Sequence, residues 1–361
     1  MNLCTRARLQ MVSITVPLTL LAASCSLGGG ADEGGSDGDS TGSGSDPVVL
    51  VTHDSFALPE ELVASFEEQS GLELEVRPSG DAGALTNKLV LTKDSPTGDV
   101  AFGVDNTFAS RAVDEGVFAS YAPTLPEGAA ELELPGDEDD ALTPVDTGNV
   151  CVNVDDTWFQ SEGIAPPRTL ADLADPAYQD LLVVPGAATS SPGMAFLLAT
   201  IAEFGEAWPA YWADLVDNGV KLTSGWSDAY QADFTQGGGK GDRPVVVSYD
   251  SSPAFTVDGE GGTTTSALLD TCFRQVEYAG VLAGAENPDG AEQVVDFLLS
   301  EEVQAALPTS MYVFPVSSDV ELPAEWAEFA PQPEAPYDVD PAAIAANRDD
   351  WLREWSDVTS R

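Results

Sequence analysis

The chain has 361 residues, 43% of them hydrophobic, which is enough for two globular domains with a substantial core. Asp and Glu number 61 against 14 Lys and Arg, so the formal net charge at pH 7 is −47. That charge excludes the electrostatic footprint of a nucleic-acid-binding protein, and the apolar sequence is too irregular for a polytopic membrane protein. The acidic composition is typical of a protein surface in a salty medium, and it would also concentrate cationic ligands near the protein. By itself it therefore does not indicate which ligand binds.

The first 24 residues have the pattern of a signal peptide. Arg6 and Arg8 form a short basic segment, the stretch 11–23 is apolar, and small residues precede Cys25. A bilayer-spanning helix needs about 20 apolar residues, so this stretch is too short to remain as an anchor. We therefore predict that residues 1–24 are removed on export.

The residues directly before Cys25 resemble the lipobox of bacterial lipoproteins. This resemblance implies cleavage before Cys25 and attachment of lipid to its sulfur, although Ala22 stands where the motif usually has Leu. The alternative is an incidental cysteine. Residues 26–46 contain eight Gly and, as apolar residues, only Leu27 and Ala31, so they are predicted to form a flexible acidic tether.

Two cysteines remain once Cys4 has left with the signal peptide and Cys25 is committed to lipid. These are Cys151 and Cys272. In an exported protein, two remaining cysteines favour a disulfide, and two free buried thiols are the alternative.

Strands and helices are predicted to alternate three times between residues 47 and 116. The expected strands are 47–53, 72–77 and 99–104, and the expected helices are 59–69, 83–91 and 108–115. This order predicts a parallel, doubly wound sheet with ligands at the carboxyl ends of its strands. The segments at those ends are polar and turn-prone: 53–55, 78–81 and 105–107.

The alternation resumes in the second half of the chain. The expected strands are 150–154, 181–184, 244–249 and 273–278, and the expected helices are 193–204, 208–217, 291–299, 301–306 and 341–356. Two α/β units with a helical tail predict two lobes with a cleft between them. The pattern does not indicate where the chain crosses from one lobe to the other.

Nine segments with recognisable motifs follow one another along the chain. They are VTHDSF (51–56), GDAGALTNKL (80–89), GDVAFGVDNT (98–107), TSSPGMAFLL (189–198), SGWSDAY (224–230), VVVSYDSSPAF (245–255), FRQVEYAG (273–280), LPTSMYVFPV (307–316) and ANRDDWLREW (346–355). Together and in this order they resemble the thiamine-binding proteins of bacterial ABC importers, within the type II periplasmic binding proteins. The resemblance is less specific for the ligand, because relatives for iron and polyamines share the scaffold.

The resemblance implies an α/β, two-lobed type II periplasmic-binding-protein fold, each lobe a mixed sheet flanked by helices, with the ligand cleft between the lobes. The first lobe would comprise 47–144 and 271–361, and the second 145–270. Cys151 and Cys272 would lie on neighbouring crossing segments, so the hypothesis is a disulfide close to the hinge. We expect a monomer without a cofactor or metal.

Thiamine carries a permanently positive thiazolium ring, an aminopyrimidine and a hydroxyethyl tail that is phosphorylated in some forms. Aromatic faces hold a flat cation, and carboxylates balance its charge. The resemblance implies aromatic contacts from Trp226, Tyr249 and Tyr312, although the family usually has Trp at the last position. The alternative for each is a core or rim aromatic.

Polar candidates follow from the same motifs. Asp81 is either the N-cap of a helix or a ligand contact, and Ala82 beside it replaces a usual Gly. Ser190 and Ser191 lie at a predicted helix start and are expected to meet the hydroxyethyl or phosphate end of the ligand. After Tyr249, the candidates at a strand end are Asp250, where the family usually has Thr, with Ser251 and Ser252.

His53 is the single His of the chain and stands where the family usually has Tyr. It is either an ordinary loop residue or a cleft residue, in which case its protonation weakens binding of a cation. Asp54 and Asp105 are further carboxylates at strand ends and are also cleft candidates.

Other functions have weaker support in the sequence. The sequence does not support an enzymatic function. The GxSxG spacing of a nucleophilic serine occurs only within the tether, at 34–38 and 38–42, and no phosphate-binding loop motif occurs. A thiaminase-like enzyme would need Cys151 or Cys272 as a nucleophile, which a disulfide between them excludes. Ferric binders usually show adjacent tyrosines, whereas SYDSSPAF has one. Polyamine binding stays open, and a surface adhesin is disfavoured by the motif matches.

The prediction is thus a non-enzymatic lipoprotein on the outer face of the cytoplasmic membrane. It would bind thiamine or a thiamine phosphate and deliver it to the permease of an ABC transporter.

Overall fold

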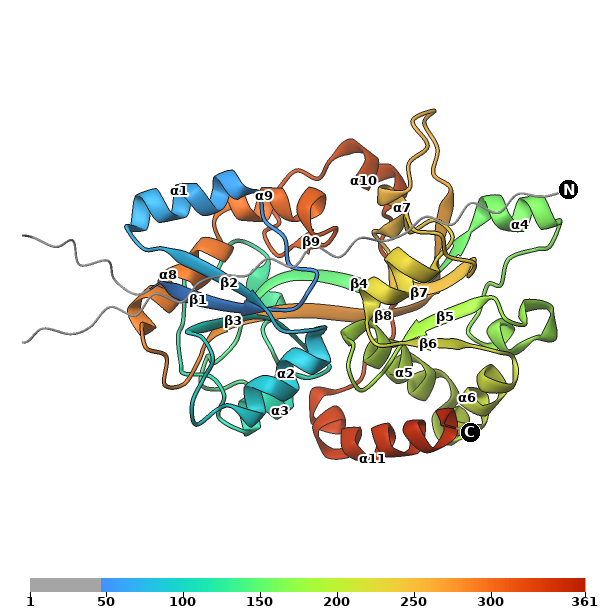
Figure 1. The fold of residues 1–361 in the computed structure, drawn as a ribbon, viewed down its shortest axis with the longest axis horizontal. Helices are drawn as coiled ribbons and strands as arrows, with labels where there is room; N and C mark the ends of the chain where they lie inside the picture. Colours follow the sequence, from blue (N-terminus) through green and yellow to red (C-terminus); the bar gives the residue numbers. More distant parts are fainter. Residues whose placement is uncertain (1–46, 361) are drawn as a thin grey trace, which may run out of the picture. The chain divides into compact units, whose positions relative to one another are not determined.

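The computed structural model describes residues 47–360, so the predicted signal peptide, the lipid attachment at Cys25 and the tether 26–46 lie outside the described residues. Within the described part, nine strands form one mixed sheet in the order β2-β1-β3-β8-β4-β7-β5-β6, with β9 paired to β4 (Figure 1). The sequence predicts an α/β fold, and the observed architecture agrees.

The first group of elements alternates as predicted, and each lies within a few residues of its expected bounds. Its strands are β1 (Val48–Thr52), β2 (Leu74–Pro78) and β3 (Val100–Asp105), and its helices are α1 (Glu60–Ser70), α2 (Ala82–Leu91) and α3 (Ala109–Asp114). β1 pairs in parallel with both β2 and β3. β1 and β3 are almost wholly buried, which explains their unbroken apolar sequence. Helix α1 ends where Gly71 adopts the left-handed φ of 72° that glycine accepts without strain.

The second group repeats this arrangement. Its strands are β5 (Leu182–Pro185), β6 (Lys221–Thr223) and β7 (Val245–Tyr249), and its main helices are α5 (Ser191–Phe204) and α6 (Trp208–Asp217). β5 pairs in parallel with β6 and β7. Strand β6, which has three half-buried residues, was not predicted, because it is too short to produce a periodic pattern.

Two long strands, β4 (Thr143–Asp155) and β8 (Thr265–Val281), run between the two groups. They are antiparallel to each other, β8 is antiparallel to β3, and β4 is antiparallel to β7. The strands within residues 47–116 are parallel, as their alternation with helices predicts, and the sheet as a whole is mixed, as the resemblance implies. Local strand–helix alternation reports only on neighbouring βαβ units, whereas β4 and β8 pair across more than a hundred intervening residues.

The remaining helices lie around these strands. They are α4 (Asp156–Glu162), α7 (Ser252–Phe255), α8 (Pro288–Leu298), α9 (Glu301–Ser310), α10 (Ala324–Phe329) and α11 (Pro341–Thr359), with strand β9 (Phe314–Pro315). Short 3₁₀ turns occur at Ala129–Leu132, Ala171–Ala174, Pro176–Tyr178 and Gly205–Ala207, and a π-helical turn at Asp228–Asp233. The sequence predicted α8, α9 and α11 and missed α4, α7, α10 and β9, all of which have seven residues or fewer.

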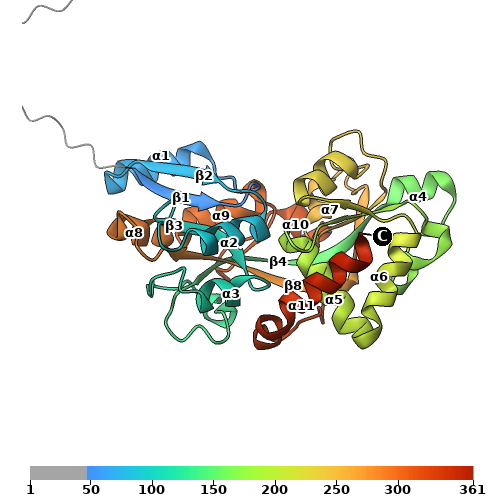
Figure 2. The same ribbon diagram turned by 60° about the horizontal axis from the view of Figure 1, so that its bottom comes forward.

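Two groups of core residues accompany the two groups of elements. Leu50, Val100 and Phe102 belong to the core around β1 and β3, and Leu197, Trp212 and Val245 belong to the core around α5, α6 and β7. In Figures 1 and 2 the two groups of elements lie on either side of β4 and β8 within the described residues. This arrangement supports a two-lobed description, while the lobe boundaries at 144 and 270 stay predictions.

The C-terminal helix α11 packs against both α6 and α3, although the predicted boundaries assign it to the first lobe. Its Trp355 meets the ring of Trp212 edge-on, with 5.6 Å between the ring centroids. No helix in the part of the chain that the structure describes has the length and apolarity needed to cross a membrane.

A disulfide joins Cys151 of β4 to Cys272 of β8, and both cysteines are buried. Their Cα atoms are 4.1 Å apart, at the irregularity where the pairing of the two strands shifts after Val150. The bond therefore fastens together the two strands that connect the groups of elements.

Candidate ligand-binding site

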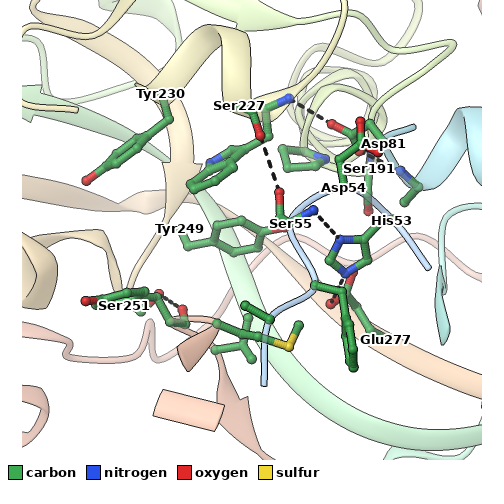
Figure 3. Close-up of a pocket in the computed structure, with 18 of the residues that line it drawn as sticks. His53, Asp54, Ser55, Asp81, Ser191, Ser227, Tyr230, Tyr249, Ser251 and Glu277 are labelled. Carbon is green, nitrogen blue, oxygen red and sulfur yellow. Dashed lines mark hydrogen bonds and ion pairs between the residues drawn. The ribbon is translucent and has the colours of Figure 1, made fainter. Parts of the chain in front are cut away.

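A cavity of about 370 Å³ lies where the carboxyl ends of the parallel strands of both groups come together. Loops after β1, β2, β5, β6 and β7 line it, with Glu277 of β8 and the segment 310–313 at the end of α9 (Figure 3). Its position agrees with the expectation for ligands in α/β sheets, and its volume is that of a site for a small molecule.

Aromatic side chains form one wall of the cavity. Trp226 stacks on Tyr230 with 5.1 Å between ring centroids and 10° between planes, and it meets Tyr249 edge-on at 6.4 Å. The wall continues through Phe255 and Tyr312, whose centroids are 5.0 Å apart. The indole Nε1–H of Trp226 donates to Ser248 Oγ at 2.9 Å, which holds the orientation of this ring.

Tyr230 and Phe255 also line the cavity and were not predicted, although both belong to quoted motifs. Tyr230 follows Trp226 by four residues, a spacing that places two side chains on one face of a helical turn, so this signal was available. Phe255 ends the short helix α7 and is 45% exposed, and nothing in its local sequence indicates that it faces a cavity.

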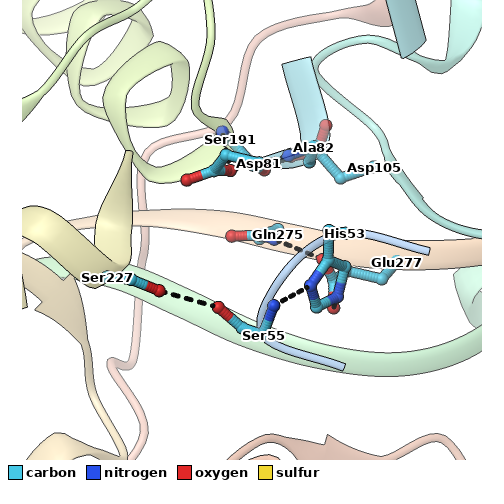
Figure 4. Close-up of polar contacts among 9 residues, drawn as sticks. All are labelled: His53, Ser55, Asp81, Ala82, Asp105, Ser191, Ser227, Gln275 and Glu277. Carbon is cyan, nitrogen blue, oxygen red and sulfur yellow. Dashed lines mark hydrogen bonds and ion pairs between the residues drawn. The ribbon is translucent and has the colours of Figure 1, made fainter. Parts of the chain in front are cut away.

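Asp81 links three segments around the cavity. Its Oδ1 accepts from the backbone N–H of Ala82 at 2.7 Å, so Asp81 is the N-cap of α2. Its Oδ2 accepts from the N–H of Trp226 at 2.7 Å, and its Oδ1 lies 3.4 Å from the N–H of Ser191 at the start of α5. The two roles weighed for Asp81 are therefore compatible, because the capping residue also lines the cavity (Figure 4).

His53 and Glu277 form the opposite wall. The Nδ1 atom of His53 accepts from the N–H of Ser55 at 3.1 Å, and its Nε2 lies 3.6 Å from Glu277 Oε2. Burial lowers the pKa of His53, but the carboxylate of Glu277, with those of Asp81 and Asp54, outweighs it and raises the pKa above 6.5. Because His53 lines the cavity, protonation of its imidazole would add positive charge to the cavity wall.

Glu277 has a second carboxyl group behind it. Asp146 pairs with Glu277 in the register of β4 and β8 and is fully buried. Burial and the nearby Glu277 raise the pKa of Asp146 well above its usual value. Burial also opposes ionisation of Glu277, but His53 outweighs it and keeps the pKa of Glu277 below its usual value. Of the two carboxyl groups, Asp146 therefore holds a proton more readily and Glu277 ionises more readily.

Three predicted contacts lie outside the cavity wall. Ser190 is fully buried. Asp105 accepts from Thr107 Oγ1 at 2.8 Å and from the hydroxyl of Ser191, and burial raises its pKa to about 7. Asp250 turns back to β4, where it accepts from Asn149 Nδ2 at 2.7 Å, and burial raises its pKa to about 6. A position at a strand end does not decide whether a side chain points into the cavity or into the sheet.

All ten of the other predicted contacts line the cavity, and their ligand roles stay predictions. They are His53, Asp54, Asp81, Ala82, Ser191, Trp226, Tyr249, Ser251, Ser252 and Tyr312. All three serine hydroxyls among them have protein partners. Ser191 Oγ donates to Asp105, Ser251 Oγ donates to the carbonyl of Tyr312 at 2.6 Å, and Ser252 Oγ lies 2.8 Å from Ser248 Oγ.

The chemistry of the wall is that of a site for a flat cation. Among residues 47–360, the charged or titratable lining residues besides the tyrosines are Asp54, Asp81, Glu277 and His53, and no Lys or Arg lines the cavity. The described residues also contain no cluster of three or more His, Cys, Asp or Glu that could hold a metal. The disulfide cysteines are not lining residues.

Comparison with known proteins places these features in context. Residues 95–336 match a family model described as bacterial extracellular solute-binding protein. The thiamine-binding periplasmic protein of Escherichia coli is 30% identical over 87% of this chain and 94% of its own length. A protein of the same name in Brucella melitensis is 31% identical over 88% and 93%.

Solved structures give a consistent result. One described as a periplasmic thiamin binding protein superimposes with a TM-score of 0.76 and 28% identity, covering 87% of this chain and 96% of its own. A ferric binding protein from Campylobacter jejuni has a TM-score of 0.67 over 86% and 99% of the two chains, but only 17% identity. At this low identity, the similarity to the ferric binding protein shows only a shared fold.

Proposed function

The chain belongs to the family of bacterial extracellular solute-binding proteins, and on that premise we propose that it binds thiamine and delivers it to the permease of an ABC transporter. It has the type II periplasmic-binding-protein fold that the resemblance predicted. It is an exported protein, like its periplasmic relatives.

The observation that carries this proposal is an aromatic wall facing carboxylates within one cavity. Trp226 and Tyr249 line the same cavity as the carboxylates of Glu277 and Asp81. Figure 3 shows Tyr249 and Glu277 on different sides of it. A desolvated cation gains about 0.5–2 kcal/mol from each aromatic face, and the carboxylates balance its charge. The thiazolium ring is therefore expected on the aromatic side and the aminopyrimidine, a donor, on the carboxylate side.

Calorimetric titration of the purified protein with thiamine and, separately, spermidine tests the ligand. We expect saturable one-to-one binding of thiamine and little binding of spermidine, because a linear polyamine covers less of the aromatic wall. Tighter binding of spermidine than of thiamine would support the polyamine alternative. Consumption of thiamine during the titration would instead identify an enzyme.

The proposal includes attachment to the outer face of the cytoplasmic membrane through lipid on Cys25, and a monomeric state. The support is the sequence before Cys25 and the acidic tether that follows. Mass spectrometry of the mature N-terminus checks the lipid, and a Cys25→Ser variant is expected in the soluble fraction. An unmodified Cys25 in membrane-associated protein would contradict the anchor.

Affinity for thiamine is expected to fall as the pH is lowered from 8.5 to 6. His53 takes up a proton as the pH passes downward through its raised pKa, and this places positive charge beside the bound cation. Protonation of its Nδ1 also removes the hydrogen bond from Ser55, which lines the same cavity. Asp105, with a pKa of about 7, loses negative charge over the same interval. We expect the dissociation constant to rise at least roughly threefold.

Titrations at pH 6, 7 and 8.5 measure this effect. A His53→Gln variant keeps a polar side chain without the charge change, so its pH dependence is expected to be shallower, with a remainder from Asp105. Equal affinity at pH 6 and 8.5 in the unmodified protein would mean that His53 does not change charge near the ligand.

A further inference from the structure

We infer that Asp146 is a positioning residue for the cationic ligand: it keeps a proton, donates its O–H to Glu277, and thereby holds the Glu277 carboxylate charged at the cavity wall. The inference rests on the proposed function and gives a role to a residue that does not itself line the cavity. None of the nine quoted segments contains Asp146, so no motif points to it.

Asp146 and Glu277 are buried side by side on the two long strands. Asp146 of β4 pairs with Glu277 of β8 in the register of these strands, and their side chains are hydrogen-bonded to each other. Both residues are buried, and Glu277 lines the cavity. Asp146 therefore stands directly behind a carboxylate of the cavity wall.

A hydrogen bond between two carboxyl groups requires a proton on one of them. Ionised carboxylates only accept, whereas a protonated carboxyl group donates through its O–H. Both carboxyl oxygens of Asp146 are buried, and neither accepts a hydrogen bond from a donor among residues 47–360. An ionised Asp146 would be a buried charge without a donor, which is costly, while the neutral form is satisfied by Glu277.

The surroundings of Glu277 assign the proton to Asp146. Glu277 Oε2 lies 3.6 Å from His53 Nε2, and Gln275 Nε2 donates to Glu277 Oε1 at 3.4 Å (Figure 4). Burial raises the pKa of Asp146, and Glu277 adds to this effect. For Glu277 the effect of burial is outweighed by His53, so its pKa lies below the usual value. The charge therefore belongs on the carboxylate that faces the cavity.

Through Glu277 this proton controls the charge that a bound cation meets. The other titratable groups around Glu277 and its partner His53 are Asp54, Asp81, Asp105 and Tyr249. With Asp146 as a donor, Glu277 stays ionised and able to balance the thiazolium charge. Without that donor, the buried carboxylate loses a hydrogen bond to its charged form, and its pKa rises.

Infrared spectroscopy of the ligand-free protein tests the proton directly. At pH 8.5 we expect the carbonyl stretch of a protonated carboxyl group in the unmodified protein and its absence from Asp146→Asn. This pH lies above the pKa of Asp105, about 7, and that of Asp250, about 6, so neither contributes substantially. A spectrum in this region that Asp146→Asn does not change overturns the inference.

Calorimetric titration with thiamine tests the effect on binding. Asp146→Asn keeps a donor toward Glu277 and is expected to retain the affinity within about threefold, whereas Asp146→Ala removes the donor and is expected to weaken binding about tenfold. As the pH is lowered, the affinity of Asp146→Ala is expected to begin falling at a higher pH than that of Asp146→Asn, because Glu277 then takes up a proton more readily.

A double-mutant cycle distinguishes positioning from damage to the fold. In a Glu277→Gln background, Asp146→Ala is expected to cause no further loss of affinity, because it acts through Glu277. Asp99→Ala is the matched control: Asp99 is a buried carboxylate outside the cavity, and it accepts from the N–H groups of Val49 and Asn287. We expect this control to lower stability in urea and to leave the affinity for thiamine unaltered.

The possible results separate this inference from the proposed function. An equal loss of affinity in Asp146→Asn and Asp146→Ala overturns the inference, because it would mean that Asp146 is ionised and balances the ligand charge itself. A further loss in the Glu277→Gln background overturns it as well. If Asp146→Ala does not fold, the infrared comparison decides alone. Failure of the unmodified protein to bind thiamine removes the proposed function and, with it, the role of Asp146 in binding.

Discussion

Replacing Trp226 by alanine is expected to weaken thiamine binding by about 30-fold, or about 2 kcal/mol. The ring lines the cavity, is backed by Tyr230 at 5.1 Å and is oriented by its hydrogen bond to Ser248. Its removal deletes the aromatic face and also lets water reach the charged ligand. Tyr249→Ala is expected to act in the same direction, because Tyr249 forms the adjoining part of the wall.

Calorimetric dissociation constants for the two alanine variants and for Trp226→Phe measure this effect. Phenylalanine keeps an aromatic face but loses the N–H, so we expect a smaller loss than with alanine. Trp351→Ala is the matched control, because Trp351 packs on the core of the second group of elements and not on the cavity. Unchanged affinity in both Trp226→Ala and Tyr249→Ala would be incompatible with an aromatic site for the cation.

Removal of the disulfide is expected to cause the largest change in stability. The bond closes a loop with a sequence separation of 121 residues between β4 and β8. In the chain-entropy model, a loop of this size contributes about 4–5 kcal/mol, and measured losses on removing native disulfides are about 2–5 kcal/mol. We expect the Cys151→Ala, Cys272→Ala double variant to lose free energy of unfolding within this range.

Urea denaturation of the oxidised protein and of the double variant compares the two free energies of unfolding. Reduction of the unmodified protein should reproduce the loss, whereas the same reductant should leave the double variant unaffected. If the two free energies of unfolding differed by less than about 1 kcal/mol, the disulfide would not reduce the conformational entropy of the unfolded chain as expected.

The sequence predicted the local elements well for a physical reason. Strands β1, β3, β5 and β7 contain short apolar runs, β2 alternates between apolar and polar residues, and α5, α6 and α11 have regular apolar spacing. Their secondary structure therefore depends on residues near in sequence. Their carboxyl ends were identified as the ligand edge for the same reason, and the cavity lies there.

The site itself was predicted unevenly. Trp226, Tyr249 and Asp81 were identified from motifs within short segments, and each lines the cavity. Glu277 was missed although it lies in a quoted segment. Its role in the cavity wall becomes visible only when the fold places His53 and Asp146 beside it. Asp250 was also predicted as a contact, but its carboxylate accepts from Asn149 and does not line the cavity, a choice that the local backbone turn makes.

The sequence by itself thus determined the family resemblance, the alternation of strands and helices, and the acidic, aromatic character of the binding segments. Only the tertiary structure decided that β4 and β8 are antiparallel, that Glu277 faces His53, and that the Asp81 carboxylate lies beside the Ser191 N–H at the start of α5. The reason is distance along the chain. Periodicity and capping act between residues a few positions apart, whereas these contacts join residues separated by a hundred or more, and their geometry exists only once the sheet has formed.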